Sequence, residues 1–330
     1  MNSTQTMRQA SSANSAAPLV AIVIVHYDCL ADTRRCIESV RSLSYPRVLP
    51  IVVDGRSPNE TAHPLTGELK RFGGEVLFAP VNGGFAFASN LGMRQALAKG
   101  AELIWLLNPD TTVDRDALTE LVREMQSASE VAAVCSKVLY APREGAPTVV
   151  DRHRIWSAGA TLDLENGRLS MIGNGEPDEG QYEAGYDCGY LPGCSLLMRS
   201  AALESVGYLR EEFFMYFEET DWCARARRKG YRLRYVPGSI VWHHFSDAKM
   251  AEPFGVYYYN RNERLFWFRW GSPSLKLRVI GRTLLKQLPS ALRARAQAPD
   301  ERHRHLFRAH VMSCLDFLFG RFGARWRPAR

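Results

Sequence analysis

The chain has 330 residues, of which 46% are hydrophobic and 23% charged, and its formal net charge is +7. This hydrophobic content is ordinary for a soluble globular protein, and the length allows one large α/β domain or two smaller ones. No apolar run reaches the roughly 20 residues that a membrane-spanning helix needs, so no such helix is expected.

The N-terminal residues and the cysteines indicate the cellular compartment. Residues 1–17 lack the apolar core of a signal peptide and are expected to form a disordered polar tail. The seven cysteines are scattered and include no CxxC pair. An odd, unpatterned set of this kind is typical of reduced thiols in the cytoplasm.

Strand and helix patterns alternate through the first half of the chain. Continuous apolar runs, typical of strands buried on both faces, occupy residues 18–27, 48–54, 75–79, 103–107 and 131–140. Apolar residues recur at helical spacing between several of these runs, over residues 32–43, 86–99 and 116–126. This alternation predicts an α/β fold with a parallel, doubly wound sheet.

Polar residues follow three of the predicted strands at their carboxyl ends. His26 and Tyr27 end the first strand, Asp54 ends the second, and Asp110 follows the strand at 103–107. In open α/β sheets these ends line one ligand-binding crevice. Asp110 suits a divalent cation that holds a phosphate, although an aspartate in a strand-end turn that caps the next helix is an equal alternative.

The absence of two well-known motifs narrows the class of nucleotide site. The sequence contains neither GxxxxGK[ST] nor GxGxxG. A P-loop ATPase and a standard dinucleotide-binding fold are therefore disfavoured.

The second half changes in character. Residues 141–189 are rich in Gly, Pro, Asp and Glu and are expected to form hairpins and loops, with short strands near 155–158 and 169–172. A dense aromatic stretch at 213–217 then precedes three acids, Glu218, Glu219 and Asp221. Strands are expected at 231–237 and 240–244, followed by an aromatic and arginine-rich helix at 254–270.

The C-terminal region is strongly basic. Residues 269–330 contain 14 Lys and Arg against 3 Asp and Glu, and apolar and basic residues alternate there at helical spacing. Such a region suits anionic lipid or nucleic acid. The alternative is a pair of ordinary helices that pack on the preceding domain with their arginines facing water. The expected organisation is thus a tail at 1–17, an α/β domain at 18–268 and a basic, amphipathic helical region at 269–330.

Eight short motifs in this order resemble the inverting glycosyltransferases of family 2, which have the nucleotide-sugar-binding GT-A fold, and within them the rhamnosyltransferase-like branch. The motifs are residues 21–27, 52–57, 82–86 with Asn90 and Gly92, 108–110, 192–194 with Met198 and Arg199, 218–222, Trp242 with His243, and 258–262. Two departures stand out: the acidic pair reads Glu-Glu, and the loop after Asp54 reads Gly-Arg-Ser-Pro.

The resemblance implies a donor site. Asp54 would accept a hydrogen bond from the pyrimidine base, the turn at 82–85 would bring glycine backbone close to the nucleotide, and Asn90 would reach the donor from the following helix. The residues implied in nucleotide-sugar binding are His26, Tyr27, Asp54, Arg56, Asn82, Gly83, Gly84, Phe85, Asn90 and Asn108.

The resemblance also implies the chemistry. Asp110 and His243 would ligate Mg²⁺ or Mn²⁺, which neutralises the departing diphosphate. Glu219 would be the catalytic base, because neighbouring residues lie about 100° apart on a helix and only one of the two glutamates is expected to point into the site. Glu218 would bind the acceptor or a loop, and Asp221 would cap or position the helix. The residues assigned to the acceptor are Trp222, Tyr258 and Arg261.

The function expected from this resemblance is transfer of a sugar from a nucleoside diphosphate to a hydroxyl of a glycan or lipid-linked glycan, in bacterial cell-surface polysaccharide synthesis. The donor expected is dTDP-L-rhamnose, with a UDP-hexose or UDP-galactofuranose as the alternative. The protein would be cytoplasmic and peripheral at the inner face of the plasma membrane, and an oligomer is possible.

Two rival functions use other features of the chain. A nucleotidyltransferase would normally carry a Gly-rich, basic loop after the first strand, and this chain has His26-Tyr27-Asp28 there. A nucleic-acid-binding protein could use the basic C-terminal region and would bind any DNA with steep salt dependence. The acidic and aromatic site would then have no role, so no nucleic-acid partner is expected.

Overall fold

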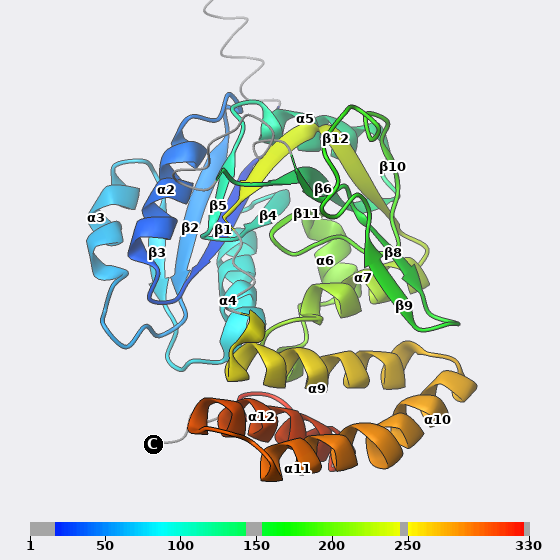
Figure 1. The fold of residues 1–330 in the computed structure, drawn as a ribbon. Coiled ribbons are helices and arrows are strands. Elements are labelled where there is room, and N and C mark those ends of the chain that lie inside the picture. Colours follow the sequence, from blue (N-terminus) through cyan, green and yellow to red (C-terminus); the bar gives the residue numbers. More distant parts are fainter. Residues whose placement is uncertain (1–16, 143–153, 245–249, 327–330) are drawn as a thin grey trace, which may run out of the picture.

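The computed structural model describes residues 17–142, 154–244 and 250–326. The tail predicted at 1–17 therefore lies outside the described residues, apart from residue 17. A mixed sheet runs through the centre of the molecule, helices cover both of its faces, and a further layer of helices lies below it in Figure 1.

The strands and helices have the following bounds. The strands are β1 Val20–His26, β2 Val48–Asp54, β3 Glu75–Phe78, β4 Leu103–Leu107, β5 Thr111–Val113, β6 Val131–Tyr140, β7 Ile155–Ser157, β8 Ala160–Asp163, β9 Arg168–Met171, β10 Tyr186–Asp187, β11 Ser195–Arg199 and β12 Arg232–His243. The helices are α2 Leu30–Arg41, α3 His63–Lys70, α4 Gly84–Ala98, α5 Ala117–Ser127, α6 Ser200–Val206, α7 Glu218–Arg228, α9 Pro253–Trp270, α10 Pro273–Arg282, α11 Leu288–Ala296 and α12 Glu301–Leu318.

The first four long strands form the parallel half of the sheet. Their spatial order is β3-β2-β1-β4, and every pair in it is parallel. β11 then inserts antiparallel between β4 and β6, and β12 pairs in parallel with β6. The prediction of a doubly wound, mainly parallel α/β sheet is confirmed. The register puts His26 opposite Asp54, so the carboxyl ends of β1 and β2 lie side by side as predicted.

Each face of the sheet has its own apolar core. One core contains side chains of α2, α3 and α5, and the other contains side chains of α4, α6 and α7. All five residues of β4 are buried, because this strand has a neighbour on each side and helices on both faces. A fully buried strand has a continuously apolar sequence, which is why the runs in this half predicted strands well.

Several elements differ from the sequence-based prediction. The strands expected at 231–237 and 240–244 are one strand, β12, whose pairing with β6 is interrupted by a shift between Val236 and Ile240. Pro237 and Gly238 lie in this interruption, where a ladder bond is not required. Helices α3 and α6 and the short strand β5 were not predicted. The expected short strands near 155–158 and 169–172 are β7 and β9.

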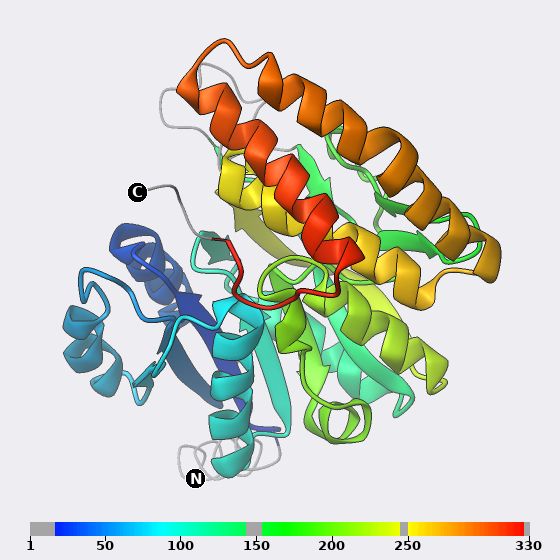
Figure 2. The same cartoon turned by 90° about the horizontal axis from the view of Figure 1, so that it is seen from below.

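The C-terminal helices pack on the catalytic domain as one unit. α12 packs along α9, and α11 packs along α12, so the basic region forms a layer of antiparallel helices (Figures 1 and 2). The domain boundary expected after residue 268 falls inside α9, which continues to Trp270. α9 therefore spans the expected boundary between the α/β domain and the basic C-terminal region. Within the described residues, no helix is both long enough and apolar enough to cross a membrane.

Candidate active site

Asp110 and His243 are brought together by a short antiparallel pair of strands. β5 begins directly after Asp110, and its first residue Thr111 pairs with His243 at the end of β12. The backbone amide of His244 donates to the Asp110 carbonyl at 2.8 Å, and His243 Nε2 lies 3.2 Å from Asp110 Oδ1. The two predicted metal ligands are thus neighbours, although 133 positions separate them in the sequence.

The pair has one exposed member and one buried member. The Asp110 side chain is 23% exposed, whereas that of His243 is 4% exposed. The ring of Trp156 meets the imidazole edge-on, with ring centroids 4.8 Å apart. Among the described residues, no group of three His, Cys, Asp or Glu is arranged to hold a metal ion.

His26 and Asp54 mark the ends of β1 and β2, and both side chains are buried. His26 is fully buried, and its two ring nitrogens hydrogen-bond to the hydroxyls of Thr33 and Thr61, each at 2.8 Å. Burial lowers the pKa of His26, which favours the neutral ring. The donor-binding role expected for the His26 side chain is corrected accordingly: this histidine is a satisfied core residue. Its neighbour Tyr27 is exposed.

The Asp54 carboxylate is held by the loop that follows it. The backbone amide of Ser57 donates to it at 3.1 Å, and the Ser57 hydroxyl donates at 2.5 Å. The Ser57 hydroxyl also accepts from the backbone amide of Asp28. Arg56, with a positive φ of 68°, is exposed beside this turn. The aspartate is therefore held in place at the strand end, with the exposed Arg56 next to it.

The glycines at the start of α4 have an intramolecular reason to be glycine. Gly84 has φ of +82°, and a Cβ there would lie 2.3 Å from the Phe214 carbonyl oxygen. A Cβ on Gly83 would lie 2.5 Å from the Phe87 ring. The Asn82 side chain accepts from the Gly84 amide, and Phe85 is partly buried in the core. The expected close approach of a nucleotide is thus not needed to explain these glycines, because the Phe214 segment already occupies that contact.

Asn90 is tied to the same segment. It is 1% exposed, its Nδ2 donates to the Leu209 carbonyl and to Glu211, and its Oδ1 accepts from the Leu209 amide. These contacts correct the expectation that Asn90 reaches the donor, because its amide group is fully used in anchoring residues 209–211 to α4.

Glu218 and Glu219 begin α7 as an interacting pair. Burial is the largest cause that raises the pKa of each, and the neighbouring glutamate raises the pKa of Glu218 further. One carboxyl oxygen of each residue is buried without a hydrogen-bond partner among the described residues. Both stand in the first turn after Phe217, whose backbone is left-handed, and their carboxyl groups interact with each other. That only one of them points into the site stays a prediction.

A tight turn connects the acidic pair with the Asp110 segment. A Cβ on Gly193 would lie 3.3 Å from Glu219 Cγ, so the Glu219 side chain packs against this glycine. The next residue, Cys194, accepts from the Asn108 amide at 3.0 Å. Burial raises the pKa of the Cys194 thiol, and the charges of Asp110 and Glu219 raise it further. Asp110 and Glu219 therefore lie on either side of one turn. The backbone of Asn108 binds this turn, and the role of Asn108 in donor binding stays a prediction.

Asp221 and Trp222 point away from this site. Asp221 is fully buried; Arg225 Nε and Trp270 Nε1 each donate to its carboxylate at 2.9 Å, and Arg210 lies 3.4 Å away. It thus holds α7 against the end of α9. Trp222 is also fully buried and donates to the Gly207 carbonyl. The acceptor-binding role expected for Trp222 is corrected, because the ring lies in the core.

Tyr258 and Arg261 are likewise structural. Arg261 is fully buried and donates to three backbone carbonyls, those of Glu212, Phe213 and Gly323. Tyr258 stacks on Phe214, with centroids 4.5 Å apart, and its hydroxyl accepts from the amides of residues 325 and 326. Neither residue presents its polar group to a cleft, so their assignment to the acceptor is corrected. Basic and aromatic residues beside acids can equally serve to anchor chain segments.

Asn262 is the residue that sequence reasoning undervalued. Its Nδ2 donates to the carbonyls of Phe213, Met215 and Tyr216, at 2.7, 2.7 and 2.9 Å. Phe214, Tyr216 and Phe217 all have positive φ angles, between 66° and 71°. A single buried amide therefore holds the strained turn that leads into Glu218 and Glu219. The sequence signal was its place at the end of the 258–262 motif, in a helix that also contains Asn260 and Glu263.

Known proteins resemble this chain in sequence and in fold. The hexosyltransferase Agl10 of low-salt glycan biosynthesis in Haloferax volcanii is 28% identical over 153 residues, 46% of each chain. The dTDP-rhamnosyl transferase RfbF of Shigella flexneri is 23% identical over 200 residues, 61% of each chain. The chain thus spans about half to three fifths of these relatives' lengths.

A solved structure extends the likeness over nearly the whole chain. The mannosyltransferase PcManGT of Pyrobaculum calidifontis, in complex with GDP-Man and Mn²⁺, superposes with a TM-score of 0.55 at 15% identity. The match covers 93% of this chain and 89% of that chain, and it shows that the fold is of the GT-A glycosyltransferase type. The family described as "Glycosyl transferase family 2" matches residues 21–207, more than half of the chain. The chain belongs to glycosyltransferase family 2.

Proposed function

We propose that this glycosyltransferase is a metal-dependent, inverting enzyme that transfers a sugar from a nucleoside diphosphate to a hydroxyl group. The observation that carries the proposal is the shared turn at Gly193 and Cys194. Asp110 and His243 stand on one side of it and Glu219 on the other. A candidate cation-binding pair and a desolvated carboxyl group thus flank one place, which is the arrangement that transfer with a leaving diphosphate requires.

Asp110 and His243 fit a divalent cation by their chemistry. A carboxylate oxygen and an imidazole nitrogen 3.2 Å apart suit Mn²⁺, and a carboxylate also suits Mg²⁺. A bound cation would neutralise charge on the diphosphate as it leaves. The buried edge of Trp156 fixes the imidazole plane, and the partly exposed Asp110 leaves the pair open to a substrate. Among the described residues, Asp110 and His243 would hold this cation where the donor's diphosphate can reach it.

The acceptor proton would go to Glu219. As the acceptor oxygen attacks the anomeric carbon, the O–H bond breaks and its proton moves to the Glu219 carboxylate, while the sugar–phosphate bond breaks and the diphosphate leaves. Burial makes this carboxylate more basic than an exposed one. Glu218, whose pKa is raised further, would stay protonated and hold Glu219 in place. One displacement of this kind inverts the anomeric centre.

Asp54 would recognise the donor's base. Ser57 fixes its carboxylate at the end of β2, and the exposed Arg56 stands beside it with no fixed partner in the described part of the chain. The rhamnosyl activity named for RfbF supports dTDP-L-rhamnose as the donor, with a UDP-hexose or UDP-galactofuranose as the alternative. The acceptor would be a glycan or lipid-linked glycan in cell-surface polysaccharide synthesis. Such an acceptor would keep the enzyme at the inner face of the membrane.

A thermal-shift panel tests the donor and metal parts together. Nucleoside diphosphates are added with Mn²⁺ or with EDTA, and a ligand at 100 times its Kd should stabilise the protein by about 2.7 kcal/mol. We expect dTDP or UDP to stabilise the wild type far more with Mn²⁺ than with EDTA. Asp110→Ala should lose the Mn²⁺-dependent part. If no nucleotide stabilises the protein under either condition, the proposal is contradicted.

A further inference from the structure

Residues 273–296 form one continuous helix that is apolar on two sides. α10 passes into a π turn at Thr283–Gln287 and then into α11 without a break. The inward side carries the buried residues Leu275, Thr283 and Ala291, which recur every eight positions. This side packs on α9 and α12. These inward contacts hold the helix in the fold. The opposite side of the helix faces outward and is exposed.

The outward side carries four exposed leucines. Leu277, Leu284, Leu285 and Leu292 are 72%, 46%, 80% and 47% exposed. They are spaced seven or eight residues apart, which is about two helical turns, so they form a stripe along one side. Leu277 and Leu285 each follow a buried residue by two positions, about 200° around the helix. Single exposed leucines are ordinary, but an aligned set of four marks an interaction surface.

A row of cations borders the leucine stripe. Arg278, Arg282, Lys286 and Arg293 are all exposed, and residues 273–296 include no Asp or Glu. The first three are four residues apart and therefore share one side of the helix. The stripe and its border thus combine an apolar surface with unbalanced positive charge.

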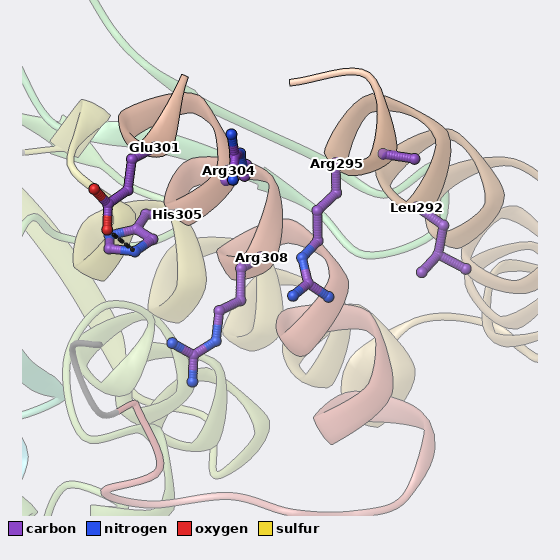
Figure 3. Close-up of a pocket in the computed structure, with 7 residues that line it drawn as sticks. Leu292, Arg295, Glu301, Arg304, His305 and Arg308 are labelled. Atoms are coloured by element: carbon purple, nitrogen blue, oxygen red, sulfur yellow. Dashed lines mark ion pairs between the residues drawn. The ribbon is translucent and has the colours of Figure 1, made fainter. Parts of the chain in front are cut away.

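A basic groove opens at the end of this stripe. It lies between α11 and α12, has a volume of about 1030 Å³ and begins at Leu292 (Figure 3). Arg295, Arg304 and Arg308 line it together with His305, which lies 3.7 Å from Glu301. Three arginines against one glutamate give the groove a positive charge, and Figure 3 shows the arginine side chains coming from both helices.

We propose that this outward face of 273–296 docks the protein on an anionic lipid membrane, with the leucines entering the interface and the cations and the basic groove binding lipid phosphates. An apolar stripe bordered by Lys and Arg is the pattern of a helix that lies in a membrane surface. A nucleic acid would leave the leucines in water. A second copy packed face to face would bring the two rows of cations together, which is unfavourable.

The docking surface has a direct connection to the catalytic part. α9 packs against α10 and α12. Its Tyr258 stacks on Phe214 in the turn before Glu218. A membrane that binds the outer helix would therefore hold the transfer site at a fixed distance from the lipid. The inference goes beyond the proposed transfer reaction and does not depend on which sugar is moved.

Vesicle co-sedimentation of the full chain tests the proposal without an activity assay. Vesicles of phosphatidylcholine are compared with vesicles that also contain phosphatidylglycerol. We expect binding only to the anionic vesicles and weaker binding at high salt. Leu277→Ser combined with Leu285→Ser should reduce binding about tenfold or more, because the variant no longer inserts these two leucine side chains into the bilayer. Phe78→Ser, at a 44% exposed position on β3, is the matched control and should bind like the wild type.

Two results would overturn the proposal. One is that the wild type binds neither phosphatidylcholine nor anionic vesicles, or that it binds both equally and the Leu277→Ser/Leu285→Ser variant binds as the wild type does. The other is a wild type that dimerises in light scattering and a leucine variant that is monomeric, without vesicle binding in either, which would identify the stripe as a protein–protein interface. Nucleotide-induced thermal shifts, measured on the same samples, separate a failure of this proposal from a failure of the transfer function.

Discussion

At the scale of single residues, the acidic pair shows how burial sets chemistry. Glu218 is 4% exposed, and both burial and the adjacent Glu219 raise its pKa. Two like charges that lie close together do not both ionise easily, so one carboxyl group of such a pair retains its proton to a higher pH than the other. In the proposed reaction, the pair would therefore supply one ionised carboxylate for proton transfer while the other would stay neutral beside it.

This arrangement predicts a pH-dependent stability. A carboxyl group whose pKa is raised in the folded state binds its proton more tightly there, so its contribution to stability is lost as the pH rises from the unfolded value of about 4.5 through the folded value. Each pKa unit of difference corresponds to about 1.4 kcal/mol. Glu218→Gln removes this titration, and its free energy of unfolding should fall less than that of the wild type between about pH 5 and pH 8.

Denaturant unfolding at several pH values measures the effect. Glu204→Gln, at an exposed position on α6, is the control and should follow the wild type. Parallel pH profiles for the wild type and Glu218→Gln would show that Glu218 has an ordinary pKa in the folded protein.

At the scale of elements, the turn at 213–217 is the most unusual feature. Three of its residues have positive φ, which is costly for non-glycine residues and persists only where the surrounding structure enforces it. Asn262 and Arg261, both buried in α9, supply the hydrogen bonds that hold its carbonyls. Gly84 provides the space for Phe214 from the other side. The start of α7, and with it Glu219, is thus positioned by α9 and α4.

Asn262→Ala should loosen this turn. It removes the side-chain donor from the Met215 and Tyr216 carbonyls, whereas the Phe213 carbonyl keeps Arg261, so we expect stability to fall by about 1–3 kcal/mol. We also expect kcat to fall with little change in the KM for the donor, because α7 rather than the donor site is displaced. Asn260→Ala is the matched control, since the Asn260 amide only donates to Val256 within the same helix. Equal effects of the two substitutions on stability and kcat would contradict the role of Asn262.

The sequence predicted the strands because burial on both faces produces continuous apolar runs, as in β4 and β6. It could not predict β5, which has three residues and exists only through its pairing with β12. That Asp110 and His243 lie close together was predicted only from the family resemblance. No local sequence pattern could predict it, because 133 positions separate the two residues. Trp222 and Arg261 were misassigned because their sequence neighbours are acids and aromatics, while tertiary packing alone determines that both are fully buried.

At the scale of the whole molecule, α9 and the chain end connect the proposed docking surface with the proposed transfer site. After α12 the chain crosses back toward α4 in Figure 2, where the Gly323 amide donates to the Glu212 carbonyl and Arg261 donates to the Gly323 carbonyl. The helical layer that carries the leucine stripe is therefore bonded directly to the segment that precedes Glu218. A lipid surface and a transfer site would be held in one rigid arrangement, which suits an acceptor that is anchored in a membrane.

The most direct measurement of the central claim is the release of nucleoside diphosphate from a panel of nucleotide sugars, in Mn²⁺ and in EDTA, by the wild type, Glu219→Gln and Glu218→Gln. We predict that the wild type turns over one class of donor only with the metal. Glu219→Gln should bind that donor in calorimetry almost as well as the wild type and lower kcat by about 10²–10⁴-fold, the usual contribution of a general base; Glu218→Gln should lower it clearly less. Equal release in EDTA would contradict the metal site, and an inactive Glu218→Gln beside an active Glu219→Gln would contradict the assignment of the base.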